Sequence, residues 1–297
     1  MNEKEQKETE VKNGIEITVK KDIEADLALI GKWFADSDSP HFKERILYFY
    51  KTLGKKLEDF TDEPEKVVED YFREIYASKE KEIDEIVEES KRILEEESPA
   101  SLAVLADLMD YDPEKGQKFI AIPTLLPYSP FHEPVFNFSI VGKLFLGKKN
   151  EVLDTAIHEI SHFLLFDILK DLNIDLADKR SLEHMFKEAL TGMLLSEPEL
   201  ENLLNRKNYL GNPEIQNLFI KDGDEKEVIL REYLRSEFRN HKARGLSFSD
   251  FIKAMMEKFL PKASEFYQKK TFWDKNEQEL KAGNSELLEI YSEPIKI

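Results

Sequence analysis

The stretch AIHEISHFLL, residues 156–165, holds two histidines four residues apart, with a glutamate directly after the first. At 3.6 residues per turn, His158 and His162 share one helix face with about 5–6 Å between their Cβ atoms, so both imidazoles can bind one metal ion. Glu159 lies one step around the helix, where its carboxylate can reach a water molecule without binding the metal itself. Because zinc lowers the pKa of a water molecule that it binds to about 7, the pattern is typical of zinc-dependent hydrolysis with Glu159 as general base.

The helix that carries this HExxH motif can be placed from its surroundings. We expect it to run from about Glu151 to Leu172, with Asn150 as its N-terminal cap and Asn173 near its end. Its apolar residues form a stripe that would bury the helix and hold the histidines in place: Ile157, Ile160, Leu164 and Ile168. The alternative interpretation is that the two histidines are ordinary polar residues and bind no metal.

A catalytic zinc site needs a third protein ligand and one open position. The chain has no cysteine, which excludes the cysteine-containing site of the peptide deformylases and leaves His, Asp and Glu as ligands. The residues after His162, FLLFDI, contain neither the third histidine nor the glycine of the metzincins. The next predicted helix, SLEHMFKEALTGMLL, offers three candidates, Glu183, His184 and Glu188.

The residues HEISH followed by KEALTGML resemble the gluzincin metallopeptidases, in which HExxH is followed on a second helix by a ligating glutamate. This resemblance implies that His158, His162 and Glu188 bind Zn²⁺ and that Glu159 is the catalytic base. The chain departs from the family in a longer gap before the glutamate. It also has Gly192 where thermolysin-like members have an aspartate that supports the first histidine. A different residue must therefore orient His158.

Two other choices of third ligand stay open. Glu183 lies closer to the usual gluzincin spacing, and His184 would give a three-histidine site of the kind seen in SprT-like proteases. We rank Glu188 first, Glu183 second and His184 third. The oxyanion formed during hydrolysis usually receives a hydrogen bond from a Tyr or His after the third ligand, and Tyr233 and His241 are the candidates here.

The remaining sequence predicts an α+β fold that is predominantly helical. Residues 23–110 have the periodicity of successive amphipathic helices, and Ser98 with Pro99 is expected to begin one of them. The segments KFIAIPTLLPYSP and EPVFNFSIVGKLFLGKK predict a small β-sheet directly before the HExxH helix, in a zincin-like catalytic core. The segment PVFNFSIVGKLFL resembles the edge strand that zincins place beside the metal, where a peptide substrate adds as a further strand. The alternative is an ordinary half-buried strand.

Two domains follow from this pattern. Residues 1–110 form an N-terminal helical region whose first dozen residues are disordered, and residues 111–297 form a zincin-like metallopeptidase domain with a helical C-terminal part.

The composition of the chain indicates which partners and which cellular compartment to expect. With 61 acidic against 43 basic residues and a net charge of −18, the chain would repel a nucleic-acid backbone. No apolar run approaches the about 20 residues that cross a bilayer, and the start MNEKEQKETEVKNG lacks a secretory signal. We therefore expect a cytoplasmic protein without nucleic-acid or membrane partners.

The leading hypothesis is a zinc metallopeptidase that acts on a peptide or protein substrate. The alternative is a zincin-like protein that binds a peptide or protein partner with little or no catalysis.

Overall fold

The computed structural model describes residues 14–35, 46–47, 50–51, 54, 64–112, 115–206, 209, 211–223 and 226–297. The chain divides into two compact units. Unit 1 comprises the residues up to Ala106 and Asp112–Ile157, and unit 2 comprises Asp107–Tyr111 and His158–Ile297. The strands that we assigned to the metallopeptidase domain thus belong to the same unit as the N-terminal helices. The predicted disorder of the first dozen residues lies outside the described residues.

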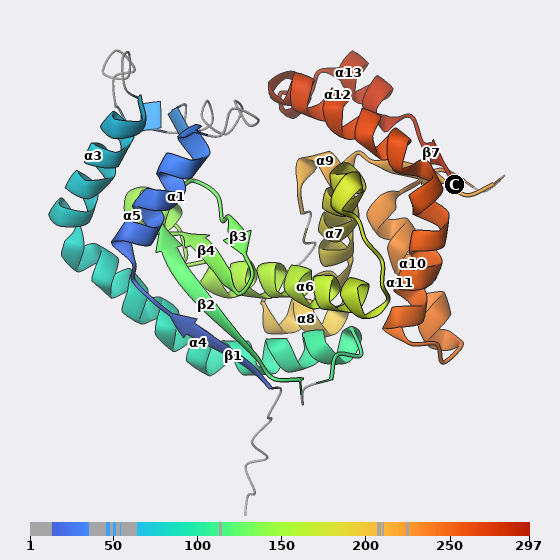
Figure 1. Ribbon diagram of the computed structural model, residues 1–297, viewed down its shortest axis with the longest axis horizontal. Helices are drawn as coiled ribbons and strands as arrows, with labels where there is room; N and C mark the ends of the chain where they lie inside the picture. Colours follow the sequence, from blue (N-terminus) through green and yellow to red (C-terminus); the bar gives the residue numbers. More distant parts are fainter. Residues whose placement is uncertain are drawn as a thin grey trace, which may run out of the picture. The chain divides into compact units, whose positions relative to one another are not determined.

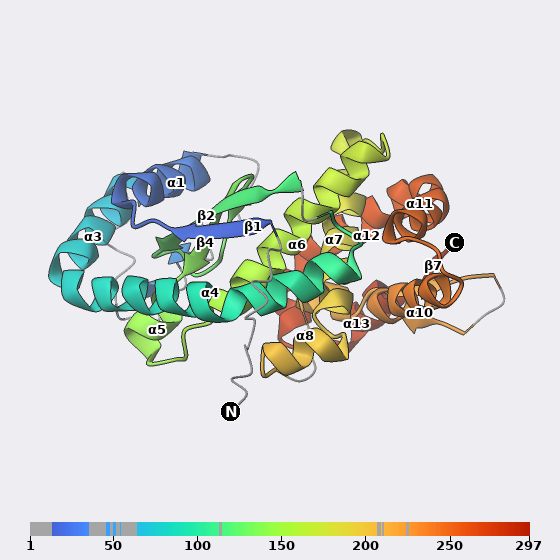
Figure 2. The same cartoon turned by 90° about the horizontal axis from the view of Figure 1, so that it is seen from below.

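Unit 1 contains a four-stranded sheet and helices on both of its sides. The strands are β1 (Ile15–Val19), β2 (Gln117–Thr124), β3 (Phe131–His132) and β4 (Val135–Ser139). The helices are α1 (Ile23–Ala35), α3 (Pro64–Ser78), α5 (Val141–Leu146) and most of α4 (Glu80–Leu108). Figure 2 shows α1 and α4 on opposite sides of the sheet. The predicted small sheet before the HExxH helix is confirmed, whereas β1 was not foreseen.

The order of the strands corrects one expectation about this sheet. The order is β1-β2-β4-β3, with β1 parallel to β2, β2 parallel to β4, and β3 antiparallel to β4. The predicted edge strand in PVFNFSIVGKLFL is therefore wrong: its strand, β4, lies inside the sheet, and its second half forms α5. β4 pairs with β2 on one side and with β3 on the other, and its apolar residues Phe136 and Phe138 are buried.

The predicted helix start at Ser98 is also wrong. Helix α4 continues through Pro99, although proline has no N–H for the helical hydrogen bond. The Ser98 hydroxyl donates to the Leu94 carbonyl instead of capping a new helix. Burial of one continuous apolar stripe outweighs the roughly 3 kcal/mol cost of an interior proline. This stripe includes the predicted residues Ile83, Ile86, Val87, Ile93 and Leu94 and extends to Leu102 and Leu105.

Unit 2 is mainly helical (Figure 1). Its helices are α7 (Arg180–Leu194), α8 (Pro198–Leu203), α9 (Pro213–Gln216), α10 (Leu230–Ala243), α11 (Phe248–Phe259), α12 (Ala263–Lys281) and α13 (Ser285–Ser292), with short 3-10 turns at Ala177–Lys179 and Leu260–Lys262. Strands β5 (Phe219–Lys221), β6 (Val228–Ile229) and β7 (Ile295–Lys296) form a second small sheet that the sequence did not indicate. Helix α7 packs against α10 and α12.

Helix α6 (Val152–Asp171) carries the HExxH motif and matches its predicted bounds to within one residue. The Asn150 side chain accepts a hydrogen bond from the Val152 N–H, as expected of a cap. Asn173 ends the helix with a φ of 56°, a left-handed conformation that asparagine tolerates better than most residues. Among the described residues, no helix is long and apolar enough to span a lipid bilayer.

A buried carboxylate joins α1 to the sheet in unit 1. Asp26 is fully buried and accepts hydrogen bonds from the Tyr76 hydroxyl at 2.8 Å, the Leu125 N–H at 3.0 Å and the Thr124 hydroxyl. Because all three partners donate, a carboxylate suits this position better than an amide.

We therefore expect Asp26→Asn to destabilise the protein. The amide would turn its own N–H groups toward donors and leave at least one buried donor unpaired, which costs about 1–3 kcal/mol of unfolding free energy. Urea unfolding followed by circular dichroism measures this. The matched control is Asp84→Asn, where an exposed carboxylate pairs with Lys21 and a change below about 0.5 kcal/mol is expected. Equal stabilities of the two variants would contradict the role given to Asp26.

Candidate metal centre

Helix α6 brings the three residues of the motif together in unit 2. The ligand atoms of His158, Glu159 and His162 lie within 4.8 Å of one another, so the group could hold a metal ion. The two Nε2 atoms of the histidines are 3.0 Å apart. His162 and Glu159 are buried, while the His158 side chain is 18% exposed.

Helix α7 places the carboxylate of Glu188 close to the same two nitrogens. Glu188 Oε2 lies 3.5 Å from His158 Nε2, and Glu188 Oε1 lies 3.4 Å from His162 Nε2. Around a tetrahedral ion with ligand distances of about 2.0–2.1 Å, neighbouring ligand atoms are roughly 3.3 Å apart. The two nitrogens are 3.0 Å apart, and each lies 3.4–3.5 Å from a different oxygen of the Glu188 carboxylate, so all three distances are close to this value.

A chain of hydroxyl groups determines which nitrogen of His162 carries its proton. The Ser161 hydroxyl donates to the His158 carbonyl at 2.6 Å, so Thr191 must donate in its 2.6 Å contact with Ser161. With the Thr191 proton thus used, the 3.1 Å contact between Thr191 Oγ1 and His162 Nδ1 requires an N–H on Nδ1. His162 Nε2 then presents a lone pair, which is what a metal ligand needs.

Tyr209 orients the first histidine. Its hydroxyl lies 2.9 Å from His158 Nδ1, and the Arg231 guanidinium donates to the Tyr209 carbonyl at 2.7 Å. Gly192 makes room for that arginine, since a Cβ at this position would stand 3.2 Å from Arg231 Cδ. Glycine at this position thus lets Arg231 reach the Tyr209 carbonyl and hold the tyrosine that contacts His158.

A lysine contacts the carboxylate of Glu188. Lys187 Nζ lies 2.7 Å from Glu188 Oε1, and both side chains are almost buried, at 10% and 12% exposed. Burial alone would raise the pKa of Glu188, but the positive charge of Lys187, 2.7 Å away, helps to hold this pKa well below its usual range. Glu188 is therefore ionised at neutral pH.

Burial gives the motif residues different protonation states. It lowers the pKa of His158, and it lowers that of His162 to about 3, so both imidazoles are neutral at pH 7, the form that binds metals. Burial also raises the pKa of Glu159 to about 8. Glu159 Oε2 is buried and has no hydrogen-bond partner among the described residues. A metal ion beside the histidines would lower the pKa of Glu159, because its positive charge favours the ionised carboxylate.

No protein-family model, curated protein or solved structure matches this chain. The interpretation of the site accordingly depends on its own geometry.

The other predicted site residues lie elsewhere in unit 2. Within the described residues, Glu183 and His184 form no hydrogen bond or ion pair with the histidines of α6, and His184 Nε2 instead lies 3.3 Å from Glu214 Oε2. Tyr233 donates to Asp222 and accepts a hydrogen bond from Lys258. His241 Nδ1 lies 2.8 Å from the backbone carbonyl of Glu237, a turn earlier in its own helix. Of the three candidate third ligands, Glu188 is the one beside the histidines.

Sequence reasoning missed Tyr209 and Lys187. Tyr209 follows α8 outside any regular element, so no periodicity relates it to His158. Lys187 directly precedes Glu188, and the helix pattern alone would have placed its long side chain in solvent. The apolar stripe of α7 was predicted correctly and is buried: Leu182, Met185, Phe186, Ala189, Leu190, Met193 and Leu194.

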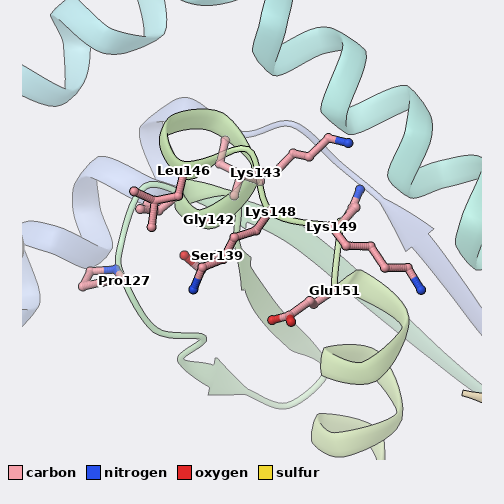
Figure 3. Close-up of a pocket in the computed structure, with 11 residues that line it drawn as sticks. Pro127, Ser139, Gly142, Lys143, Leu146, Lys148, Lys149 and Glu151 are labelled. Carbon is pink, nitrogen blue, oxygen red and sulfur yellow. The ribbon is translucent and has the colours of Figure 1, made fainter. Parts of the chain in front are cut away.

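A separate pocket of about 230 Å³ lies in unit 1 between α5 and the start of α6 (Figure 3). Its lining includes Lys143, Lys148 and Lys149, but Lys143 pairs with Glu89 at 3.3 Å, and Glu151 brings a negative charge. None of the residues that line it belongs to the candidate metal centre.

The partners of the histidines predict how metal affinity responds to mutation. Tyr209→Phe and Thr191→Val each remove a hydroxyl that orients an imidazole, so each should weaken metal binding roughly 10- to 100-fold. Competition against a chromophoric chelator measures the affinity. Tyr267→Phe, at a tyrosine that is 63% exposed, is the matched control and should bind like the wild type. Wild-type affinity in both variants would show that these hydroxyls do not orient metal ligands.

Proposed function

We propose that the protein is a zinc-dependent metallopeptidase of gluzincin type, with His158, His162 and Glu188 as zinc ligands and Glu159 as general base. The observation that carries the proposal is the close approach of the two Nε2 atoms and the Glu188 carboxylate, at 3.0–3.5 Å, near Glu159, whose buried Oε2 has no hydrogen-bond partner among the described residues. Two neutral imidazoles and one carboxylate form a donor set that catalytic zinc commonly takes, with a fourth position left for water or substrate.

Environment distinguishes the roles of the two glutamates. Glu188 is kept ionised by positive neighbours and faces both Nε2 atoms, which suits a ligand. Glu159 has its pKa raised to about 8 by burial, which suits a group that takes up and returns a proton near neutral pH. The resemblance to the gluzincins supports the same assignment.

Peptide hydrolysis requires a proton to move from water to the leaving amine. When bound, a zinc ion supplies a Lewis acid that polarises the scissile carbonyl and acidifies water. Glu159 accepts the proton from the attacking water and passes it to the amine nitrogen as the peptide bond breaks. Tyr209 and Thr191 keep the two imidazoles oriented throughout.

Metal content is the first test. Protein purified without a His-tag should contain about one zinc per chain by elemental mass spectrometry, and His162→Ala and Glu188→Ala should lose it, whereas Glu159→Gln should retain it. Retention in Glu188→Ala together with loss in Glu159→Gln would reverse the roles of the two glutamates. No zinc in the wild type, even after zinc is offered, would contradict a metal site.

Hydrolysis is the second test. Against a broad peptide library, zinc-loaded Glu159→Gln should turn over about 10²- to 10⁴-fold more slowly than the wild type, because the general base is lost. Glu265→Gln, at a glutamate that pairs with Lys262, is the control and should keep its activity. Unchanged turnover in Glu159→Gln would contradict the mechanism. Full zinc binding without any turnover in the wild type would instead favour a partner-binding protein of zincin-like type.

A further inference from the structure

The peptidase proposed above needs a group that stabilises negative charge on the carbonyl oxygen of the substrate. The two residues that the sequence suggested for this task are engaged elsewhere, Tyr233 with Asp222 and Lys258, and His241 with a backbone carbonyl. Tyr209 contacts Nδ1 of His158, the nitrogen on the far side of the imidazole from Nε2.

Lys187 differs from these residues because its charge lies at the metal centre itself. Its Nζ is 2.7 Å from Glu188 Oε1, the oxygen that faces His162 Nε2 at 3.4 Å. Its charge also acts electrostatically on His158 and Glu159. The side chain of Lys187 is 10% exposed, similar to Glu188 at 12%, so it has as much access to solvent as the ligand that it contacts.

From this position we infer that the Lys187 ammonium binds the negatively charged oxygen of a ligand at the metal centre, and in peptide hydrolysis the oxyanion of the scissile carbonyl. This inference rests on the proposed function and adds a catalytic residue to it. A lysine side chain has four carbons and three rotatable donors, so its ammonium can turn from Glu188 toward a substrate oxygen while remaining near both.

The charges of the site favour this role. Neutral histidines, a divalent ion and the Glu188 carboxylate sum to +1, and Lys187 raises the sum to +2 while Glu159 holds the proton taken from water. A new negative oxygen is therefore attracted by twice the net charge that it would meet without the lysine. Because the site is largely buried, this attraction is screened less than at the protein surface.

Binding of a small anion tests the inference without a known substrate. The probe is acetohydroxamate, which binds a metal through oxygen, titrated into protein loaded with excess cobalt(II) so that binding changes the visible absorption. Lys187→Met should bind the probe roughly 10- to 100-fold more weakly than the wild type, and Lys187→Arg, which keeps the charge, should recover most of the affinity. Lys262→Met, which breaks an ion pair with Glu265 away from the site, is the matched control and should bind like the wild type.

The outcomes separate this inference from the proposed function. Equal probe affinity in Lys187→Met and the wild type, at equal cobalt content, would overturn the role of the lysine. Lys187→Gln keeps a polar end and replaces the methionine variant if that variant does not take up cobalt. If the wild type binds acetohydroxamate with the expected dependence on Lys187 but hydrolyses no peptide, the anion site stands and the peptidase proposal fails. If the loaded wild type binds no acetohydroxamate, the inference is wrong.

For the hydrolytic reaction, the same variants give a second measurement. Lys187→Met should lower kcat about 10²- to 10³-fold with a much smaller change in KM, because the oxyanion forms in the transition state and not in the bound substrate. Lys187→Arg should restore part of kcat. A change in KM alone would place the lysine in substrate binding and contradict its role at the oxyanion.

Discussion

The arrangement of the site depends on the convergence of two imidazoles from successive turns of one buried helix. Their Nε2 atoms lie 3.0 Å apart, a distance at which two lone pairs repel unless a proton or a cation lies between them. The hydroxyl chain through Thr191 assigns the lone pair to Nε2 of His162. Tyr209 can donate or accept, so it suits either tautomer of His158. A cation between the rings would be attracted by both lone pairs at once.

Gly192 on α7 faces the Arg231 side chain, and its missing Cβ gives that arginine room. A Cβ there would stand 3.2 Å from Arg231 Cδ, so the arginine would have to shift. In its present position the Arg231 guanidinium donates to the Tyr209 carbonyl, and the Tyr209 hydroxyl lies 2.9 Å from His158 Nδ1. A glycine on α7 therefore affects the group that contacts the first histidine of α6.

Much of this arrangement could be predicted from the sequence, because local periodicity determined it. The bounds of α6, the caps Asn150 and Asn173, and the apolar stripe of α7 all follow from residues within a few turns of one another. Tyr209 could not be predicted, since its contact with His158 depends on an irregular segment and on an arginine from α10. The helix through Pro99 was missed because tertiary burial outweighed a local signal. The interior place of β4 was missed because strand order is not encoded in one strand's pattern.

The two glutamates illustrate why residue types alone did not settle their roles. Both are largely buried, yet one pKa is lowered and the other raised, because Glu188 lies against the positive charge of Lys187 while burial dominates at Glu159, whose Oε2 has no hydrogen-bond partner among the described residues. A carboxylate that is already ionised can hold a cation, whereas a carboxylate with a raised pKa is, once ionised, the stronger acceptor of a proton. Lys187 contributes to both, since it pairs with the first and lowers the proton affinity of the second. In the proposed peptidase, an anion that draws the Lys187 ammonium toward itself would therefore also raise the proton affinity of Glu159, because the same positive charge acts on both glutamates.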